Sequence, residues 1–484
     1  MRPPMLAHRL TRSVGHGTHA VPPVPRSSKP PRPVFDAENG IDGHELERLL
    51  GGISPARLVR EYWGRKVLHV SGFAGRYRGL FDRDAFFRAI ERGARLPPSS
   101  GFELWAAFDG RSERDEFTPM TRIQPSQART MLAAGATVQA RHVTLVDANL
   151  AAFSSAIKAQ IGCPGTLMLS AFLSPDGAGF KTHFDAKNVI GWQIEGRKRW
   201  RVSKRKAVET PTKGALYLSN GYGRYEDGSE PEEPWQQFRR IPLKDFVDVE
   251  LAQGDAFFVP AGVWHGCDAQ GESLSMSFAV AHCPVADVLA TALGALLGGE
   301  ASWRSAPVLA ADELASDAFW GARLGELRRA IDELERKPLH IRRELATRVT
   351  ALPVRDLDEA GSNGNGRKEI GKDDLLRLSP RRALVSVGDA SEASEASEAS
   401  EASEGGLLLC VGDRSLELDD PRLAAITKEI LRRRRFRAGD CVTWARGRGR
   451  VDWSSARDLL GALVAIGALE TDLSTERARR RMAG

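Results

Sequence analysis

Cysteine is scarce in this chain of 484 residues, and its arrangement excludes two classes of protein. The five cysteines are an odd number with wide spacing and no CxxC pair: Cys163, Cys267, Cys283, Cys410 and Cys441. Disulfide-stabilised secreted domains and structural zinc sites need more regular, closely spaced cysteines. We therefore expect free thiols and a cytoplasmic protein, because the cytosol keeps thiols reduced.

Long hydrophobic runs are also missing. No stretch approaches the about 20 consecutive apolar residues that a membrane-spanning helix needs, so no membrane association is expected. Hydrophobic residues make up 42% and charged residues 27% of the chain, a balance typical of globular domains. The length allows several domains, each with a core of its own.

Acidic residues are absent before Asp36, whereas Pro, Ser and Arg are frequent there. A segment of this composition cannot bury enough apolar surface to fold, so residues 1–38 are expected to be a disordered basic tail. Two further basic runs are "LRRRRFR" at Leu431–Arg437 and "RARRRM" near the C-terminus. They indicate either contact with a nucleic acid or ordinary solvated surface.

Between Gly165 and about Ala281 the sequence becomes rich in β-favouring residues. Short runs of this kind are separated by Gly, Pro and Asp turns: "GTLMLSAFLS", "VIGWQIEG", "RKRWRV", "DAFFVP" and "SLSMSFAV". Several short strands with such turns predict an antiparallel barrel or jelly roll. We expect Glu195-Gly196 to be a hairpin turn, with "RKRWRV" as the returning strand.

The remainder of the chain indicates helices followed by a mixed module. "ARLGELRRAIDELERK" places an apolar stripe at helical spacing, which either covers the barrel or pairs with a second subunit: Leu324, Leu327, Ile331 and Leu334. Beyond the linker "AGSNGNGRKE", a short helix is expected in "KDDLLRLSP". The Ala-Ser-Glu repeat is expected to be a flexible loop between two paired strands. Helices near Arg422–Arg432 and Ser454–Ile466 complete a pattern that resembles a winged helix.

The residues that indicate chemistry are two histidines and an aspartate. His183 and Asp185 stand two apart, and residues at this spacing on a strand face the same side. The segment "GDAFFVPAGVWHG" presents His265 after a turn, on a strand that an antiparallel barrel can place beside the first. Two imidazoles and one carboxylate on one face suit Fe(II) and leave coordination positions open, whereas zinc more often closes a tetrahedral site.

One basic side chain is expected to point into the barrel. In "RKRWRV", Lys198, Trp200 and Val202 share one face, and the three arginines share the other. A lysine on an otherwise apolar face needs a buried anionic partner. Lys198 is therefore predicted to bind the anionic group of a co-substrate. The alternative is that its side chain extends past Trp200 to solvent. The register across residues 186–188 leaves Lys187 as a second candidate.

These motifs together resemble a known family. "HFDAKNVIGWQIEGRKRW" is similar to the core of the JmjC-type ribosomal oxygenases, whose pattern runs H-[YF]-D and then Q-[LIV]-x-G-x-K-x-W. The matching positions are His183, Asp185, Gln193, Gly196, Lys198 and Trp200. "GDAFFVPAGVWH" resembles the segment that carries the family's second iron histidine, and "EYWGRKVLHVSG" is similar to its N-terminal "yW-kkPl-v" segment.

The resemblance implies an α+β architecture in three parts. A JmjC double-stranded β-helix, or jelly-roll barrel, is expected over residues 39–284. A helical dimerisation region is expected over 285–360, and a winged-helix-like domain over 361–484 with a low-complexity loop at 389–406. The resemblance also implies that His183, Asp185 and His265 bind Fe(II).

Co-substrate binding is implied as well. Lys198 is implied to pair with the distal carboxylate of 2-oxoglutarate. Upstream, where the family often reads N-x-Y-x-T-P, this chain has Ser170, Phe172 and Ser174 before a proline, and the two serines are expected at the co-substrate site. The change from Tyr to Phe172 removes a hydroxyl there, which leaves substrate choice open.

The expected function is that of an Fe(II)- and 2-oxoglutarate-dependent dioxygenase. Family members hydroxylate a His or Arg side chain of a ribosomal protein, so a ribosomal protein substrate and a homodimer are implied. One alternative is a JmjC-type lysine demethylase, which uses the same iron chemistry. Another is a non-enzymatic regulator in which the winged-helix-like module and "LRRRRFR" bind nucleic acid.

Overall fold

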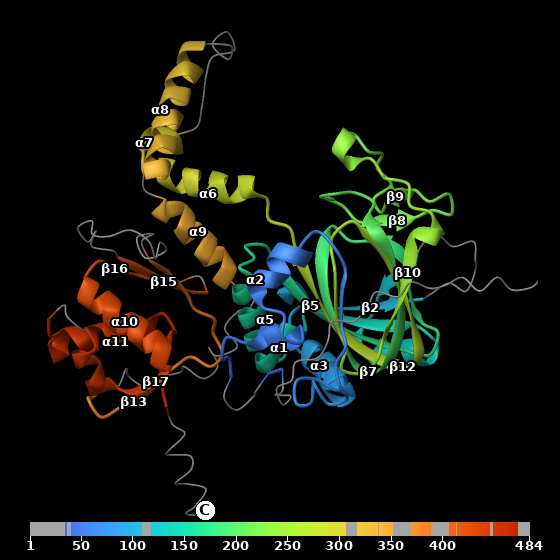
Figure 1. Cartoon of the computed structure of the whole chain (residues 1–484), viewed down its shortest axis with the longest axis horizontal. Coiled ribbons are helices and arrows are strands. Elements are labelled where there is room, and N and C mark those ends of the chain that lie inside the picture. Colours follow the sequence, from blue (N-terminus) through green and yellow to red (C-terminus); the bar gives the residue numbers. More distant parts are fainter. Residues whose placement is uncertain are drawn as a thin grey trace, which may run out of the picture.

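The structure, a computed structural model of the chain, describes residues 34–35, 40–108, 118–305, 317–336, 338–351, 369–388, 406–412, 414–445 and 449–472. An antiparallel, barrel-shaped sheet forms its largest part, and a module of helices and small sheets lies beside it (Figure 1). Helices between these two parts carry an arm that projects away from both. The Ala-Ser-Glu repeat lies outside the described residues.

The described part of the barrel contains twelve strands in one sheet, all paired antiparallel. Their bounds are β1 (Leu68–Val70), β2 (Glu103–Ala107), β3 (Met120–Arg122), β4 (Thr137–Arg141), β5 (Leu167–Ser174), β6 (Gly179–Phe184), β7 (Lys187–Lys206), β8 (Ala215–Tyr217), β9 (Gly223–Tyr225), β10 (Phe246–Leu251), β11 (Ala256–Val259) and β12 (Val263–Ala281). The two longest, β7 and β12, pair along most of their length, and β12 also pairs with β5 and β6. Strand β12 therefore brings β5, β6 and β7 together.

The prediction of a hairpin turn at Glu195-Gly196 is wrong. Strand β7 continues through both residues, and β12 follows it on either side, with a bulge opposite the glycine. Gly196 has φ of 68°, so the strand bends here without reversing. A Cβ at this position would come within 2.2 Å of the Glu272 carbonyl oxygen, which explains why only glycine fits.

The alternation along the second half of β7 is as predicted. Lys198 is 2% and Val202 2% exposed, and both point inward with Trp200, whereas the arginines between them are exposed. Each arginine meets an acid of a neighbouring strand: Arg197 meets Glu250 at 2.7 Å, Arg199 meets Asp268 at 3.2 Å and Arg201 meets Asp248 at 3.1 Å. The arginine face is thus a row of exposed ion pairs, each worth little by itself.

Helices from the N-terminal part cover one side of the sheet: α1 (Glu45–Leu49), α2 (Pro55–Arg57), α3 (Arg83–Gly93), α4 (Ala128–Ala133) and α5 (Ala148–Ile161). The central contact is that of Phe153 on α5, whose ring lies 6.0 Å from that of Trp192 and 5.9 Å from that of Phe278. Within the segment predicted as a disordered tail, Val34 and Phe35 are buried, and Phe35 packs edge-on against Phe153.

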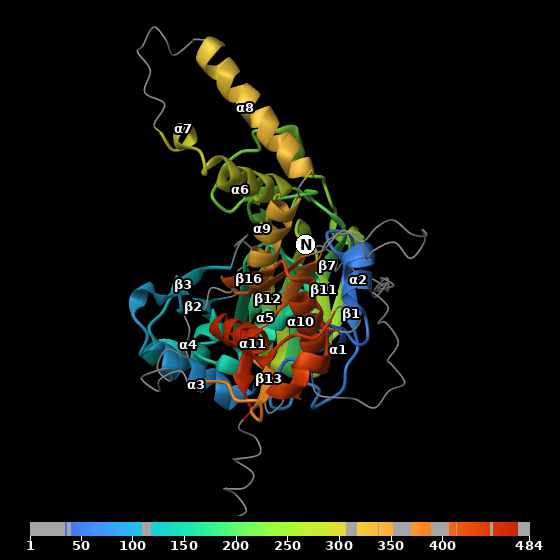
Figure 2. The same cartoon turned by 90° about the vertical axis from the view of Figure 1, so that its left-hand side faces the viewer.

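The helical region after the barrel consists of α6 (Val285–Leu297), α7 (Ala301–Arg304), α8 (Asp317–Arg336) and α9 (Leu339–Thr350). Helix α9 is fastened to α5 by the buried Lys158, whose Nζ donates to the carbonyl oxygens of Arg348 at 2.7 Å and Ala351 at 2.6 Å. Helix α8 contacts α6 and α9 and extends away from the barrel, which both views show (Figures 1 and 2).

The C-terminal module holds α10 (Pro421–Arg433), α11 (Trp453–Ala465) and two three-stranded sheets within its described residues. One sheet joins β13 (Leu375–Leu378), β17 (Arg435–Arg437) and β18 (Leu469–Thr471); the other joins β14 (Val385–Gly388), β15 (Leu407–Val411) and β16 (Arg414–Leu418). The pairing of β14 with β15 confirms that the strands flanking the repeat are partners, and both expected helices are present.

The prediction of a short helix in "KDDLLRLSP" is wrong. Leu375–Leu378 is a central strand, paired with β17 on one side and β18 on the other. Within the strand, Leu376 and Leu378 are buried while Leu375 and Arg377 are partly exposed, which is the alternation of a strand.

Two predicted absences can be examined in this structure. All five cysteines are free thiols. None of the helices in the described ranges is both long and apolar enough to cross a bilayer.

The bend at Gly196 gives a test of the fold. Gly196→Ala should lower the free energy of unfolding by about 3 kcal/mol or more, because it combines a disfavoured φ with a backbone clash. Gly271→Ala is the matched control, with φ of 78° and no atom within 4 Å of the added Cβ. It should cost only about 1 kcal/mol. Urea denaturation of both variants measures the difference; equal losses would contradict the steric role of Gly196.

Candidate metal and co-substrate site

Strand pairing places the two predicted histidines side by side. His183, near the end of β6, is the register partner of His265 on β12, and their ring centroids lie 4.5 Å apart. Asp185 follows directly after β6, and its Oδ2 lies 3.6 Å from His265 Nε2. The possible ligand atoms of all three residues lie within 4.8 Å of one another. Residues distant in the sequence thus meet in one cluster.

Hydrogen bonds orient both imidazoles. Nδ1 of His183 lies 2.8 Å from the Lys181 carbonyl oxygen, and Nδ1 of His265 lies 2.9 Å from that of Val263. A carbonyl can only accept, so each Nδ1 carries the proton and donates it. Each Nε2 then keeps its lone pair for a metal, which is the usual arrangement of metal-binding histidines.

The electrostatics of the cluster favour the protonation states that a metal requires. Burial lowers the pKa of His183, and the neighbouring His265 lowers it further, so this imidazole stays neutral. Burial raises the pKa of Asp185, but the close His265 and His183 rings lower it by more, and the pKa falls to about 2. Neutral imidazole nitrogens and an ionised carboxylate are the forms that bind metal ions.

The triad opens onto a cavity of about 640 Å³ inside the barrel. Apolar rings form part of its wall, among them Phe172, Trp200 and Phe257, and polar groups contributed by several strands interrupt them. Phe184, Trp192, Phe258 and Trp264 are fully buried core residues and do not line it. A cavity with a few converging polar groups is the usual form of a small-molecule site.

Lys198 lies inside this cavity. Its Nζ donates to Ser275 Oγ at 3.2 Å and sits 5.7 Å from the centre of the Phe172 ring. In the part of the chain that the structure describes, no carboxylate forms an ion pair with it. Burial lowers the pKa of this lysine, because a charge without a partner is disfavoured in a dry environment.

Of the other predicted residues, two line the cavity and one does not. Ser170 lines the cavity, and its buried Oγ has no hydrogen-bond partner. Ser174 lies four residues further along β5, does not line the cavity, and accepts a hydrogen bond from Thr137 Oγ1 at 3.0 Å. Lys187 is exposed and lines the cavity near Asp185, on the side where the triad lies.

Sequence reasoning missed several lining residues. Ser275 is the most important, because it is the hydrogen-bond partner of Lys198. A signal for it existed: in "SLSMSF" the serines recur at every second position, so one face of this strand is polar although it points into a barrel. Gln139, Arg141 and Glu226 also line the cavity, but no local pattern marks them.

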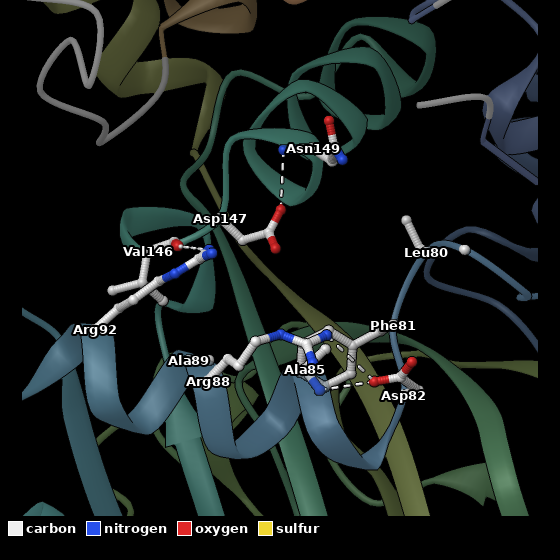
Figure 3. A pocket seen from close by; sticks show the side chains of 11 residues that line it. Leu80, Phe81, Asp82, Ala85, Arg88, Ala89, Arg92, Val146, Asp147 and Asn149 are labelled. Carbon is white, nitrogen blue, oxygen red and sulfur yellow. Dashed lines mark hydrogen bonds and ion pairs between the residues drawn. The ribbon is translucent and has the colours of Figure 1, made fainter. Parts of the chain in front are cut away.

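A second cavity, of about 320 Å³, lies between α3 and the start of α5 (Figure 3). Its charged groups have partners within the chain. Arg88 lies 3.6 Å from Asp82, and Arg92 donates to the Val146 carbonyl oxygen at 3.0 Å. Asp147 accepts from the first backbone N–H groups of α5, which makes it a helix cap. These groups stabilise helix ends, so we assign no ligand to this cavity.

The donor set fits a non-haem iron site. Two imidazoles and one carboxylate on one side of a metal leave the opposite side open for other ligands, and that side faces the cavity. The lowered pKa of His183 and that of Asp185 favour the neutral ring and the ionised carboxylate that bind a metal. The Ser170 hydroxyl without a hydrogen-bond partner and the buried Lys198 ammonium line the same cavity as the triad.

Comparison with known proteins identifies the barrel. Residues 151–288 match the family model of the JmjC domain. The chain is 23% identical to the uncharacterized protein YxbC of Bacillus subtilis over 257 residues, which cover 51% of this chain and 74% of that protein. It is 24% identical over 234 residues to Ribosomal oxygenase 1 of Gallus gallus, and these residues cover 48% of this chain and 35% of that protein.

A further relative is the "Bifunctional lysine-specific demethylase and histidyl-hydroxylase NO66" of Dictyostelium discoideum. It is 24% identical over 261 residues, which cover 52% of this chain and 45% of that protein. The chain thus spans less than half of the length of these last two relatives. Among solved structures, Escherichia coli ycfD covers 86% of this chain and 98% of its own, with a TM-score of 0.50 and 14% identity.

A structure of YcfD described as a ribosomal oxygenase in complex with cobalt and succinic acid matches with a TM-score of 0.50 and 12% identity, covering 86% of this chain and 98% of its own. Identity this low makes the likeness one of fold. The mixed α+β structure and its large antiparallel sheet agree with a JmjC cupin fold. Residues 151–288 therefore match a JmjC domain, and the chain is similar, at low identity, to proteins named ribosomal oxygenases.

Proposed function

We propose that this protein is an Fe(II)- and 2-oxoglutarate-dependent dioxygenase that hydroxylates a side chain of another protein. The observation that carries the proposal is the cavity that the triad and Lys198 share. A metal site at one end and a buried cation without an acidic partner at the other match a ligand with two anionic ends. 2-Oxoglutarate is a dicarboxylate of that kind.

His183, Asp185 and His265 would hold the metal through two Nε2 atoms and one carboxylate. Bound Fe(II) would supply the chemistry, in which dioxygen is consumed, 2-oxoglutarate becomes succinate and carbon dioxide, and one oxygen atom enters the substrate. The protein's own groups fix the ligands and exclude water. The backbone carbonyls of Lys181 and Val263 hold the rings in place, and the apolar wall keeps the reaction dry.

Lys198 would hold the distal carboxylate of 2-oxoglutarate. Its side chain is 2% exposed, so the resulting ion pair would be shielded from water and would orient the co-substrate. Lys187 is less suited to this role, because it is exposed and lies near Asp185.

The proposed substrate is a ribosomal protein, with a His or Arg side chain as the target. Support comes from the relatives, which include proteins named ribosomal oxygenases. The cavity has polar groups from β4, β7 and the segment after β9 that a target side chain would meet, namely Gln139, Arg141, Lys187 and Glu226. This mixed lining suits a polar target side chain.

Lysine demethylation stays the second candidate, because the Dictyostelium relative carries both activities in its name. The hypothesis of a nucleic-acid-binding regulator is less favoured, because the basic run has acidic partners. Arginines of "LRRRRFR" pair with acids of the same module: Arg432 and Arg433 with Glu429, Arg435 with Asp472 and Arg437 with Asp373. The run therefore offers less free positive charge than its sequence indicates.

We also propose that α8 forms a homodimer. Three large apolar side chains on it are about half exposed: Trp320 at 47%, Leu324 at 51% and Ile331 at 50%. Leu334, in the same stripe, is 6% exposed because α8 contacts α6 and α9 at this end. Burial of a Leu or Ile side chain is worth about 1.5–3 kcal/mol, so a second copy of this arm would gain stability by covering the stripe.

Removal of a metal ligand gives the first functional test. Purified protein with Fe(II), 2-oxoglutarate and ribosomal proteins should produce succinate and a peptide heavier by one oxygen atom, measured by mass spectrometry. His183→Ala should reduce turnover by at least about 1,000-fold, because two ligands bind the metal poorly. His282→Ala, outside the cavity, is the control. Turnover of His183→Ala at the wild-type rate would contradict the triad. Loss of a methyl group with release of formaldehyde would establish demethylation instead.

Lys198→Met tests the co-substrate role. The 2-oxoglutarate concentration for half-maximal succinate formation should rise at least about tenfold, because a charge-assisted hydrogen bond is lost. Lys187→Met should leave it close to the wild-type value. If Lys187→Met raised the requirement and Lys198→Met did not, the anchor would be Lys187.

The dimer is tested by charge placed on the exposed stripe. Leu324→Glu together with Ile331→Glu should convert the protein from dimer to monomer, because burial of two carboxylates would be costly. Arg329→Glu, an exposed residue on the opposite face of the same helix, should leave the dimer intact. Sedimentation equilibrium measures the mass; a wild-type monomer at all concentrations would contradict the proposal.

A further inference from the structure

We propose that Cys163 and Cys283 form a reversible disulfide when the protein meets hydrogen peroxide, which makes this pair a covalent modification site at the base of the helical arm. The inference goes beyond the proposed function and does not depend on it, because neither thiol lines the cavity that contains the triad.

The two cysteines lie where the barrel meets its helices. Cys163 directly follows Gly162, the C-cap of α5, and Cys283 lies between the end of β12 and the start of α6. The backbone N–H of Ala281 donates to the Thr166 carbonyl oxygen at 2.8 Å and so holds these two segments together. The sulfur of Cys163 reaches the same junction, 4.0 Å from the Ala281 carbonyl oxygen.

Electrostatic interactions show that the two sulfurs are neighbours. Burial raises the pKa of Cys163; the Gly165 N–H and the Lys158 ammonium oppose this, and the sulfur of Cys283 adds to it. Burial lowers the pKa of Lys158, and both sulfurs oppose that change. Both cysteines stand outside helices and strands, so their backbones can adjust to the separation of roughly 4.4–6.8 Å between Cα atoms that a disulfide requires.

Arg348 of α9 places a positive charge beside Cys283. Its Nη1 donates to Cys283 Sγ at 3.3 Å, while Nη2 donates to Thr291 Oγ1 at 2.6 Å and Nε donates to Glu344, so the guanidinium is held in place. A neighbouring cation stabilises a thiolate, which is the nucleophilic form of cysteine. Cys283 is partly exposed, whereas Cys163 is only 8% exposed. Cys283 is therefore the thiol that meets the peroxide first.

The reaction proceeds in two balanced steps. The Cys283 thiolate attacks one oxygen of hydrogen peroxide, the O–O bond breaks, and a sulfenic acid and hydroxide form; the hydroxide takes up the proton that the thiol released. The Cys163 sulfur then attacks the sulfenic sulfur, the S–O bond breaks, and the hydroxyl group leaves with the Cys163 proton as water. Both thiols are oxidised, and the peroxide is reduced to water. A dithiol reverses the bond by exchange.

The disulfide would close a loop that contains the whole triad, since His183, Asp185 and His265 all lie between the two cysteines in the sequence. A cross-link restricts the unfolded chain more than the folded one, and this effect grows with the length of the closed loop. The oxidised protein should therefore unfold at a higher temperature than the reduced protein.

Peptide mapping by mass spectrometry tests the inference. After treatment with hydrogen peroxide, denaturation and alkylation, the peptides of Cys163 and Cys283 should be joined and lighter by two hydrogen atoms than their sum, and dithiothreitol should separate them. Cys410 and Cys441, both fully buried, are internal controls that should be recovered as alkylated thiols. Cys163→Ser should leave a sulfenic acid on Cys283 that dimedone labels, and neither Cys163→Ser nor Cys283→Ser should show the rise in melting temperature.

Replacement of the arginine tests the order of the steps. Arg348→Met should slow disulfide formation by about tenfold or more, because a hydrogen bond to a charged group is lost, and Arg348→Lys should keep part of the rate. Arg343→Met is the matched control on the same helix, since Arg343 contacts Ser415 and Glu417. A thermal melt verifies that each variant is folded.

Two results would overturn the inference. One is that peroxide leaves both thiols open to alkylation. The other is that it carries Cys283 to the sulfinic acid while Cys163 stays a thiol. An unchanged rate in Arg348→Met would contradict the role of the arginine. All of these outcomes leave the proposed function untouched, because they are measured without 2-oxoglutarate or turnover.

Discussion

The pairing of β12 with β6 is the contact on which the rest of the site depends. It makes His265 the register partner of His183, although the two are far apart in the sequence. A shift of either strand by one residue would turn its histidine to the opposite face, because side chains alternate along a strand. The same strand β12 continues past its bulge to pair with β5, and there it presents Ser275 beside Lys198. One long strand thus supplies a residue of the triad near one end and the hydrogen-bond partner of Lys198 near the other, so the distance between the two is set by backbone hydrogen bonds.

The interior of the barrel is built at a cost in stability. Lys198 is buried without an acid, and two buried atoms in the cavity wall, Ser170 Oγ and Trp200 Nε1, have no hydrogen-bond partner. Core positions of a protein that only had to fold would avoid such groups. Elsewhere in the chain the charges are well paired: the arginines on the outer face of β7 each meet an acid, and those after α10 do the same. Three further buried atoms without a partner, on Trp192, Gln193 and Trp264, lie outside the cavity wall, so within the described residues the feature particular to the cavity is the buried Lys198 without an acid.

Local patterns predicted the triad, the inward direction of Lys198 and the order of barrel, helices and C-terminal module. They did so because spacing by two on a strand and by three or four on a helix has direct consequences for which side chains meet. The errors have a common physical cause. Gly196 and the leucines around Leu376 were assigned from neighbouring residues, whereas their conformations are set by strands distant in the sequence, β12 in one case and β17 with β18 in the other. Ser275 was missed because its importance comes from Lys198, a residue on another strand. Pairing between strands distant in the sequence determines such features, and this pairing is difficult to predict from a single sequence.

The anchoring of α9 by Lys158 has a consequence for any assembly of this protein. Its ammonium group binds the two carbonyl oxygens at the end of α9, where the helix dipole places negative charge, and the hydrogen bonds are buried. The arm that carries α8 therefore starts from a helix that is clamped to the back of the barrel rather than from a loose tether. If two arms associate, the mouths of the two cavities acquire a defined separation and direction. A large target would then meet both openings in a fixed geometry, so the shape of the assembly would itself restrict which surfaces of a target protein reach the triad.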